Sequence, residues 1–307
     1  MLFFWRLNRY SMNKKRVLVT GVTGFTGMHL SAELHAHGYD VWGTSRISNA
    51  NPKICTLDVL NSEAIAQVLD FVRPEIIIHM AGVSFVDNND ISAMYAANLV
   101  GTRNLLSAAA KSKSPPELVI IPSSSNVYAP SIKHLSEESP LLPANDYAIS
   151  KLAVEYLANL WNDRLNIIVT RPFNYTGLGQ TDQFLVPKII SHFHLKKKCI
   201  NLGNLDVSRD ISDVRSVTTL YRLLIEKRPT SGIYNICSGK PVSIKEIIDT
   251  ASSVYGHQLD IISSQELRRS NDIVYQCGDQ TKLRNAIGDF KAYCLEDTLN
   301  WFRQSMG

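Results

Sequence analysis

The sequence predicts an α/β protein whose core is a doubly wound parallel β-sheet, followed in the chain by a smaller α/β lobe. Between Arg16 and Thr170, short apolar runs alternate with stretches of helix length, an order typical of a doubly wound sheet with right-handed crossovers. The runs do not alternate apolar and polar residues, which indicates strands buried on both faces of a parallel sheet. After Pro172, glycine, asparagine and proline become more frequent and the elements shorter, which indicates a second lobe folded against the first.

The strands and helices of the first part follow from local pattern. The first strand is a β-branched run, the third a continuous apolar run, and the second helix must end before Pro74. The predicted strands are Val17–Thr20, Tyr39–Thr44, Ile76–His79, Leu118–Ile121 and Ile167–Thr170. The predicted helices are Met28–His37, Glu63–Val72, Ala93–Ser112 and Asp146–Asn162.

The later part of the chain is less regular. Its predicted elements are a helix over Ile211–Glu226, a returning strand over Gly232–Ile236, and helices over Ser243–Tyr255 and Leu295–Gln304. We expect a first domain over residues 12–172, completed by about 211–237, and a smaller lobe formed by 173–210 and 238–307. Residues 1–11 carry an apolar run too short for a signal sequence or a membrane span, and we interpret them as a dispensable extension ahead of Met12.

Composition narrows the function classes. The 307 residues are 45% hydrophobic and 20% charged, ordinary for a soluble globular protein, and the net charge of +4 gives no basis for nucleic-acid binding. This small positive charge fits polyanionic ligands, but only weakly. The five cysteines lack CxxC spacing, which indicates reduced thiols in a cytoplasmic protein and neither a disulfide framework nor a metal site.

A glycine-rich turn links the first strand to the first helix. Residues 20–27, TGVTGFTG, have GxxGxxG spacing, which lets backbone N–H groups approach a pyrophosphate at a helix N-terminus. An ordinary strand-to-helix turn is the alternative interpretation. The second strand ends in residues 43–46, GTSR, with no carboxylate to bind a ribose 2′-hydroxyl. Arg46 can instead bind a 2′-phosphate, which favours NADPH over NADH. The alternative interpretation is an arginine on a solvated loop. Asp58 could accept a hydrogen bond from adenine, and we expect His79 to be packed and not catalytic.

Tyr147 and Lys151 are the candidate proton-transfer pair. They are four residues apart and share a helix face, where an ammonium can lower the pKa of a phenol. Such a pair also occurs by chance on exposed helices. Serines 123–125 follow a buried strand at the sheet edge where ligands bind, and a hydroxyl there can hydrogen-bond the carbonyl oxygen that the tyrosine protonates. The alternative interpretation is that these serines only cap the next turn.

Together these motifs resemble the extended short-chain dehydrogenase/reductase family. TGVTGFTG, HMAG (79–82), NLVGT (98–102), SSSNVY (123–128), YAISK (147–151) and RPFN (171–174) stand where that family has them. The resemblance implies a Rossmann domain, a nucleotide-sugar lobe, and Ser124 as the catalytic hydroxyl beside Tyr147 and Lys151. The cofactor residues that it implies are Gly21, Thr23, Gly24, Phe25, Thr26, Gly27, Arg46, Asp58, Val59, Met80, Ala81, Gly82, Asn98, Tyr147 and Lys151.

The second lobe resembles the GDP-mannose dehydratase and GDP-4-keto-6-deoxymannose reductase branch of that family. RPFNYTG (171–177) and LGNLD (202–206) match both, whereas YNICSGKPVSI (234–244) and GDQTKL (278–283) match the reductases. Arg209 and Arg269 match arginines that clamp the substrate pyrophosphate, although surface ion pairing is their alternative role. The substrate residues that the resemblance implies are Ser84, Ser124, Ser125, Asn126, Asn174, Val186, Lys188, Asn204, Arg209 and Arg269.

Two positions depart from the family pattern. Dehydratases carry an acidic pair directly after the catalytic hydroxyl, and this chain has Ser125 and Asn126, so we do not expect 4,6-dehydration. Asp146 replaces the proline that commonly precedes the tyrosine.

The sequence therefore predicts NADPH-dependent reduction of the C4 ketone of a GDP-4-keto-6-deoxyhexose, giving GDP-D-rhamnose or its C4 epimer, with NADH as a possible substitute. The alternatives are a nucleotide-sugar 4-epimerase with tightly bound NAD and a non-catalytic protein that binds NADP(H) or a nucleotide sugar. By analogy with the family we expect a homodimer through the helices over Ala93–Ser112 and Asp146–Asn162, with no nucleic acid, membrane or metal as partner.

Overall fold

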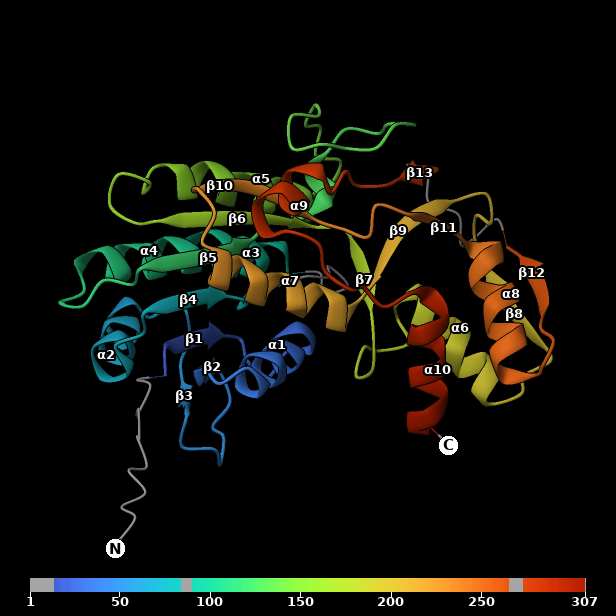
Figure 1. Ribbon diagram of the computed structural model, residues 1–307, viewed down its shortest axis with the longest axis horizontal. Helices are drawn as coiled ribbons and strands as arrows, with labels where there is room; N and C mark the ends of the chain where they lie inside the picture. The colour runs from blue at the N-terminus through green and yellow to red at the C-terminus, as the bar shows by residue number, and fades with distance from the viewer. Residues whose placement is uncertain (1–13, 84–89, 265–272, 307) are drawn as a thin grey trace, which may run out of the picture.

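The computed structural model describes residues 14–83, 90–264 and 273–306. Its larger lobe is built on a seven-stranded sheet of order β10-β6-β5-β4-β1-β2-β3, in which every neighbouring pair is parallel (Figure 1). The strands are β1 (Arg16–Thr20), β2 (Asp40–Ser45), β3 (Ile54–Thr56), β4 (Ile76–His79), β5 (Leu118–Pro122), β6 (Ile167–Pro172) and β10 (Gly232–Ile236). The predicted doubly wound parallel sheet is confirmed.

Helices cover both faces of this sheet because successive strand residues point to opposite sides. Val17 and Val19 pack toward α1 (Phe25–Ala36), α7 (Val214–Lys227) and α9 (Thr281–Ile287). Leu18, between them, packs toward α2 (Ser62–Val72), α4 (Gly101–Lys111) and α5 (Asp146–Asn159). The two apolar layers give the sheet the buried faces that its uninterrupted apolar runs require.

The smaller lobe has its own sheets and core. A four-stranded sheet combines β7 (Asn174–Thr176), β9 (Ser208–Asp213), β11 (Pro241–Ser243) and β13 (Tyr275–Gln276), while β8 (Cys199–Leu202) pairs with β12 (Asp260–Ser263). The helices α6 (Leu185–His194), α8 (Ile244–Tyr255) and α10 (Leu295–Met306) enclose a separate apolar cluster. Figure 1 shows β7 and β9 running from the large sheet into this lobe.

The predicted helix over Ala93–Ser112 is wrong as a single α-helix. The chain forms α3 (Ile91–Tyr95), a π-helical segment η1 (Ala96–Val100) and then α4. A π turn adds one residue to the helical repeat and shifts the side chains that follow it. Asn98, inside this segment, is buried with its amide bonded to Val83 and Ser150, so the wider turn coincides with a buried polar anchor.

The helix predicted over Ile211–Glu226 begins too early. Ile211–Asp213 belongs to β9, and the helix α7 starts at Val214. The Asp213 carboxylate accepts a hydrogen bond from the Arg215 N–H at 2.7 Å, and this N-cap fixes the helix start.

Candidate active site

The glycine-rich turn between β1 and α1 lies directly against the loop that follows β4. Gly21 has φ +65°, and a Cβ at this position would stand 2.9 Å from the Ala81 Cα. A Cβ on Gly27 would stand 2.4 Å from the carbonyl oxygen of Gly21. Glycine at both positions therefore permits a close backbone approach, and the exposed Thr23 and Gly24 lead into the N-terminus of α1, where N–H groups can hold a pyrophosphate.

The ends of β2 and β3 border this turn. Thr44 and Ser45 are buried, and the exposed Arg46 follows them with no carboxylate at the strand end. Asp58, just after β3, is exposed and accepts from the Leu60 N–H at 3.0 Å, while Val59 is buried. Parallel strands end at one edge, so these residues lie along the same edge as Met80, Ala81 and Gly82.

His79 is packed, as predicted, and has no catalytic geometry. Its Nδ1 lies 2.8 Å from the Thr20 hydroxyl and its Nε2 3.1 Å from the Thr102 hydroxyl. Burial lowers the pKa of this imidazole to about 3, so the ring stays neutral.

Ser124, Tyr147 and Lys151 converge where β5 ends beside α5. The Asn145 side chain caps α5 by accepting from the Ala148 N–H at 2.9 Å, and one helical turn then places Tyr147 and Lys151 on the same face. The Lys151 Nζ lies 5.9 Å from the Tyr147 ring centroid and donates to the Pro122 carbonyl at 3.0 Å. The Ser124 hydroxyl lies near enough to the Tyr147 phenol to lower its pKa.

Burial shifts the two titrating groups toward their neutral forms. It raises the pKa of Tyr147 to about 12, an effect that the nearby Ser124 hydroxyl only partly offsets. It lowers the pKa of Lys151 to about 8. Desolvation dominates the pKa of Tyr147, and the predicted role of Lys151 in lowering it stays a prediction.

Asn98 fastens the loop after β4 to α5. Its Oδ1 accepts from the Val83 N–H at 2.8 Å, and its Nδ2 donates to the Val83 carbonyl at 3.2 Å and to the Ser150 hydroxyl at 3.0 Å. A Cβ on Gly82 would meet the same Oδ1 at 2.8 Å. The cofactor edge and the helix of Tyr147 and Lys151 thus share one buried amide.

The predicted substrate residues lie after β5 of the large sheet and on several elements of the smaller lobe. Asn126 is exposed beside the buried Ser125, and Asn174 is exposed on β7. Val186 and Lys188 lie on α6, where the Lys188 Nζ donates to the Asn201 carbonyl at 3.0 Å. The Asn204 side chain accepts from the Asp206 N–H at 3.0 Å, and Arg209 lies on β9. Ser84 and Arg269 lie outside the described residues.

A buried ion pair between α5 and β6 was not predicted from the sequence. The Arg171 Nη2 lies 2.7 Å from the Glu155 Oε2, and the other oxygen of that carboxylate accepts from the Ser123 hydroxyl at 2.5 Å. The Arg171 guanidinium stands 4.7 Å from the centroid of the Tyr128 ring. An arginine at the end of an apolar strand was the available signal, since such a charge needs a buried partner.

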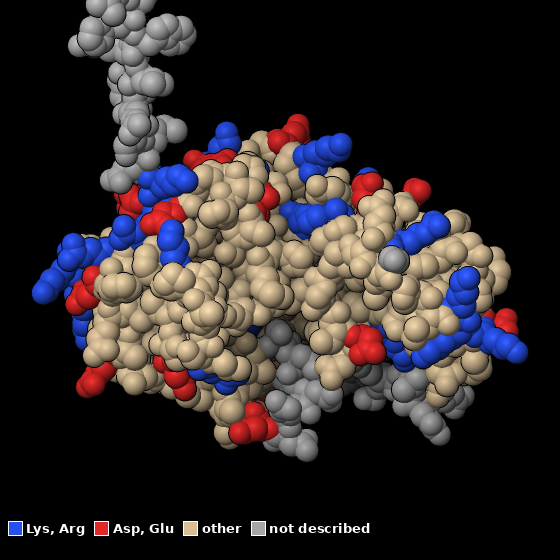
Figure 2. All heavy atoms as spheres, turned by 90° about the horizontal axis from the view of Figure 1, so that it is seen from below, with Lys and Arg blue, Asp and Glu red and all other residues tan. Residues whose placement is uncertain are grey.

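On the face shown in Figure 2, basic and acidic side chains are interspersed and form no continuous basic stripe. Within residues 14–83, 90–264 and 273–306, no helix has the length and apolar character to span a membrane. The same residues contain no cluster of three or more His, Cys, Asp or Glu side chains that could hold a metal ion.

Comparison with known proteins gives consistent matches along the chain. Residues 17–237 match the model of the NAD dependent epimerase/dehydratase family. GDP-6-deoxy-D-talose 4-dehydrogenase of Aggregatibacter actinomycetemcomitans is 34% identical over 276 residues, covering 89% of this chain and 92% of that protein. GDP-6-deoxy-D-mannose reductase of Pseudomonas aeruginosa is 30% identical over 286 residues, covering 89% and 91%.

Solved structures share the whole architecture. The crystal structure of an epimerase candidate from Burkholderia cenocepacia J2315 has a TM-score of 0.89 at 42% identity, covering 95% of this chain and 98% of its own. RMD from Pseudomonas aeruginosa, complexed with NADPH, has a TM-score of 0.84 at 27% identity, covering 95% and 99%. MoeE5, in complex with UDP-glucuronic acid and NAD, has a TM-score of 0.83 at 25% identity, covering 94% and 99%.

Proposed function

The chain belongs to the NAD dependent epimerase/dehydratase family, and from this premise we propose that it reduces the C4 ketone of a GDP-4-keto-6-deoxyhexose with NADPH. The observation that carries the proposal is the convergence of Ser124, at the end of β5, with Tyr147 and Lys151 on α5, where the Lys151 Nζ lies 5.9 Å from the Tyr147 ring centroid. Desolvation raises the pKa of Tyr147 to about 12, so this half-buried phenol keeps its proton at neutral pH. A protonated phenol held by a second hydroxyl is suited to donate to an oxygen that becomes an alkoxide.

Two relatives support the substrate class. Their names describe GDP-linked 6-deoxy-D-talose and 6-deoxy-D-mannose, sugars that differ only in configuration at C4. A reaction at that carbon accounts for both, so we propose GDP-D-rhamnose or its C4 epimer as the product. The neutral Ser125 and Asn126 beside Ser124 support reduction over dehydration, which needs a carboxylate base.

The residues at the sheet edge fit a dinucleotide. Gly21 and Gly27 leave no room for a side chain, and the N-terminus of α1 faces the turn. Arg46 would pair with a 2′-phosphate, Asp58 with adenine, and Lys151 with the nicotinamide ribose. A reduced nicotinamide bound there supplies the hydride for C4.

The chain's own groups then manage the proton. Tyr147 gives its proton to the C4 oxygen, and the Ser124 hydroxyl donates a hydrogen bond to the same oxygen. The positive charge of Lys151 stabilises the phenolate that remains. Arg209 and Arg269 are the proposed partners of the substrate diphosphate, with Asn174 and Lys188 at the nucleotide, and a homodimer through α4 and α5 stays a prediction.

The first experiment is NADPH oxidation, followed by absorbance, with GDP-4-keto-6-deoxy-D-mannose produced in situ by a dehydratase. We expect oxidation and a GDP-6-deoxyhexose whose C4 configuration NMR assigns. Tyr147→Phe should lower kcat by about 100-fold or more, because it removes the acid while retaining the ring. Equal rates with NADH would contradict the role of Arg46.

A different result would favour the 4-epimerase. Purified protein that retains NAD and isomerises a nucleotide sugar without added reductant would overturn the proposed reduction. Ligand binding with no turnover over a panel of ketosugars would instead support the non-catalytic protein.

A further inference from the structure

Gln276 reaches from the smaller lobe to the turn that carries the candidate catalytic hydroxyl. It lies on β13, is 4% exposed, and its Nε2 donates to the Ser125 carbonyl at 3.1 Å. Ser125 is the residue after Ser124 and is itself buried. A side-chain amide 151 residues away in sequence therefore holds the peptide group next to the hydroxyl.

The turn is short enough for this bond to set the direction of the Ser124 side chain. Ser124 is extended (φ −161°, ψ 151°), and residues 125–127 form a single 3₁₀ turn. The Asn126 N–H donates back to the Ser124 hydroxyl at 3.2 Å, and the Tyr128 N–H donates to the same Ser125 carbonyl at 3.2 Å. The Ser125 carbonyl and the Asn126 N–H belong to one peptide group, so a shift of that group moves the N–H that holds the Ser124 hydroxyl.

The other end of this link is the candidate diphosphate clamp. In the parallel pairing of β13 with β9, Gln276 stands opposite Arg209, so both side chains leave the same face of the sheet. The next residue on β9, Asp210, is fully buried and accepts from the Gly278 N–H at 3.2 Å. Arg209 and Gln276 are therefore parts of one rigid piece.

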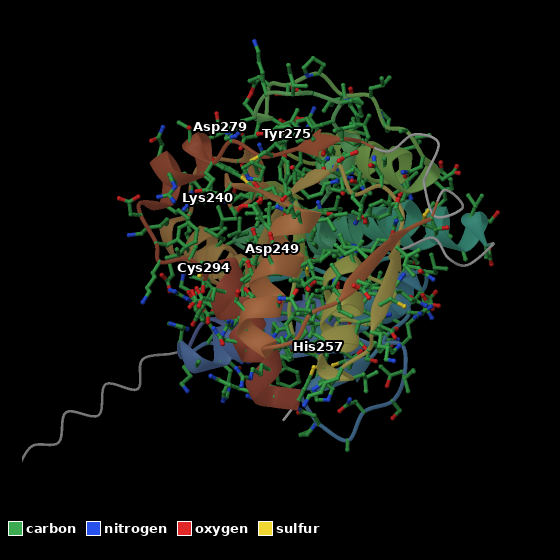
Figure 3. The ribbon with its side chains drawn as sticks, turned by 90° about the vertical axis from the view of Figure 1, so that its right-hand side faces the viewer. Lys240, Asp249, His257, Tyr275, Asp279 and Cys294 are labelled. Carbon is green, nitrogen blue, oxygen red and sulfur yellow. The ribbon has the colours of Figure 1, made fainter. Side chains whose placement is uncertain are left out.

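Figure 3 shows where this piece lies. Tyr275 and Asp279 are labelled close together near the top of that view, and the chain between them carries Gln276. The Asp210 carboxylate also accepts from the Ser238 N–H at 2.7 Å and the Gly239 N–H at 2.9 Å, which ties the segment to the end of β10.

We propose that Gln276 is a positioning residue through which the lobe that grips the substrate diphosphate aligns the Ser124 hydroxyl with the sugar C4 oxygen. This role rests on the proposed function. It makes part of the binding energy of the nucleotide diphosphate serve turnover as well as affinity, as remote binding groups do when they orient a reacting centre. A substrate without the nucleotide should therefore react more slowly even at saturation.

The test compares Gln276→Met with a matched control. Methionine keeps the length of the side chain and removes the amide donor. We expect kcat with the GDP-ketosugar to fall about 10- to 100-fold while KM for sugar and NADPH stays within about twofold, because positioning and not binding is lost. Gln280→Met is the control, since Gln280 also donates from a buried amide to a buried carbonyl, that of Cys237 at 2.6 Å, away from the Ser124 turn. It should leave kcat unchanged although thermal stability falls similarly.

The readout specific to this role is the ratio of kcat for the GDP-ketosugar to kcat for the same 4-keto-6-deoxyhexose as its 1-phosphate. We expect wild-type protein to favour the nucleotide substrate and Gln276→Met to bring the ratio close to one. Gln276→Asn keeps the amide, but its side chain is one methylene too short to reach the Ser125 carbonyl. We expect this variant to lower the ratio as Gln276→Met does, because the lost hydrogen bond and not the lost packing is the cause. An unchanged ratio, or a loss confined to KM, would overturn the role of Gln276 alone, whereas wild-type protein inactive on both ketosugars would overturn the proposed function and this role with it.

Discussion

Burial moves the two titrating groups of the site in opposite directions, because in each case it favours the uncharged form. The pKa of Tyr147 rises to about 12 and that of Lys151 falls to about 8. Near neutral pH the phenol keeps its proton and the ammonium keeps most of its charge. That combination is the one that proton donation during a reduction requires.

Turnover is therefore expected to fall as pH rises through about 8, where Lys151 loses its proton. Stability should respond with the opposite sign. The unfolded chain keeps this proton up to the ordinary lysine pKa of 10.5, so between about 8 and 10.5 the free energy of unfolding gains from this group as pH rises. The measurement is a kcat–pH profile beside urea unfolding over the same range.

Lys151→Arg provides the control for that profile, since a guanidinium stays charged throughout. Its maximum activity should be lower, because Arg cannot reproduce the ammonium contacts, but its alkaline limb should disappear. A wild-type kcat that is flat across this window would show that the charge of Lys151 does not limit turnover.

Local rules were enough to place serines 123–125 beside Tyr147 and Lys151, and the family resemblance selected Ser124 among them. Helical spacing aligns the tyrosine with the lysine, and parallel strands deliver the serine to the same edge. The direction of the shift in the pKa of Tyr147 was not accessible in this way, since it depends on desolvation by the folded chain. Gln276 was missed for a similar reason, because no short-range pattern links it to Ser125.

The π-helical segment η1 is the element that joins the cofactor edge to the catalytic helix. We expect Asn98→Ala to lower the free energy of unfolding by about 2 kcal/mol, because it leaves the Val83 N–H and carbonyl without their partner. Cofactor affinity should fall as well, since Gly82 packs against this amide. Urea unfolding and NADPH fluorescence titration measure the two effects.

Asn104→Ala is the comparison for Asn98→Ala. Asn104 lies on α4 and donates to the Val59 and Leu60 carbonyls, each at 3.2 Å, in a more exposed setting. Its loss should cost less than about 1 kcal/mol and leave cofactor affinity unchanged. Equal effects of the two substitutions would mean that the buried amide of Asn98 has no special role.

Strands that are uninterrupted apolar runs were predictable from the sequence, and the very short strands were not. The core strands β1, β4, β5 and β6 were predicted to within two residues, because each is an uninterrupted apolar run. In the smaller lobe, strands β7 and β13 have only three and two residues and carry no period. The register of such strands depends on partners distant in sequence, which is why the end of β9, Ile211–Asp213, was predicted as the start of a helix.

The course of the chain between the lobes explains why they should behave as one unit. The chain leaves the large sheet after β6, enters the smaller lobe, and returns through α7 and β10, which is the edge strand of the first sheet. Leu220 and Leu224 of α7 belong to the same apolar cluster as Val17 and Leu30. A fragment ending at residue 172 would leave that face of the sheet uncovered, so we expect residues 12–172 to need the returning segment, about 211–237, in order to fold.

Arg215, on α7, contacts residues of the smaller lobe, and we expect these contacts to make the two lobes unfold cooperatively. Its guanidinium lies 3.8 Å from the Tyr293 ring centroid and 4.0 Å from that of Trp301 on α10, and it pairs with the buried Asp213 at 2.6 Å. Arg215→Met should lower the free energy of unfolding by about 3 kcal/mol, because it removes the charged partner of a buried carboxylate and both ring contacts. Arg284→Met removes an exposed pair with Asp289 and should change the free energy of unfolding by less than about 0.5 kcal/mol.

The coupling between the lobes is measured by urea unfolding followed with tryptophan fluorescence and far-ultraviolet circular dichroism. If the two probes gave coincident transitions in wild type and separate ones in Arg215→Met, the contacts of Arg215 would account for the coupling. Separate transitions already in wild type would show instead that the lobes unfold independently despite their shared chain path.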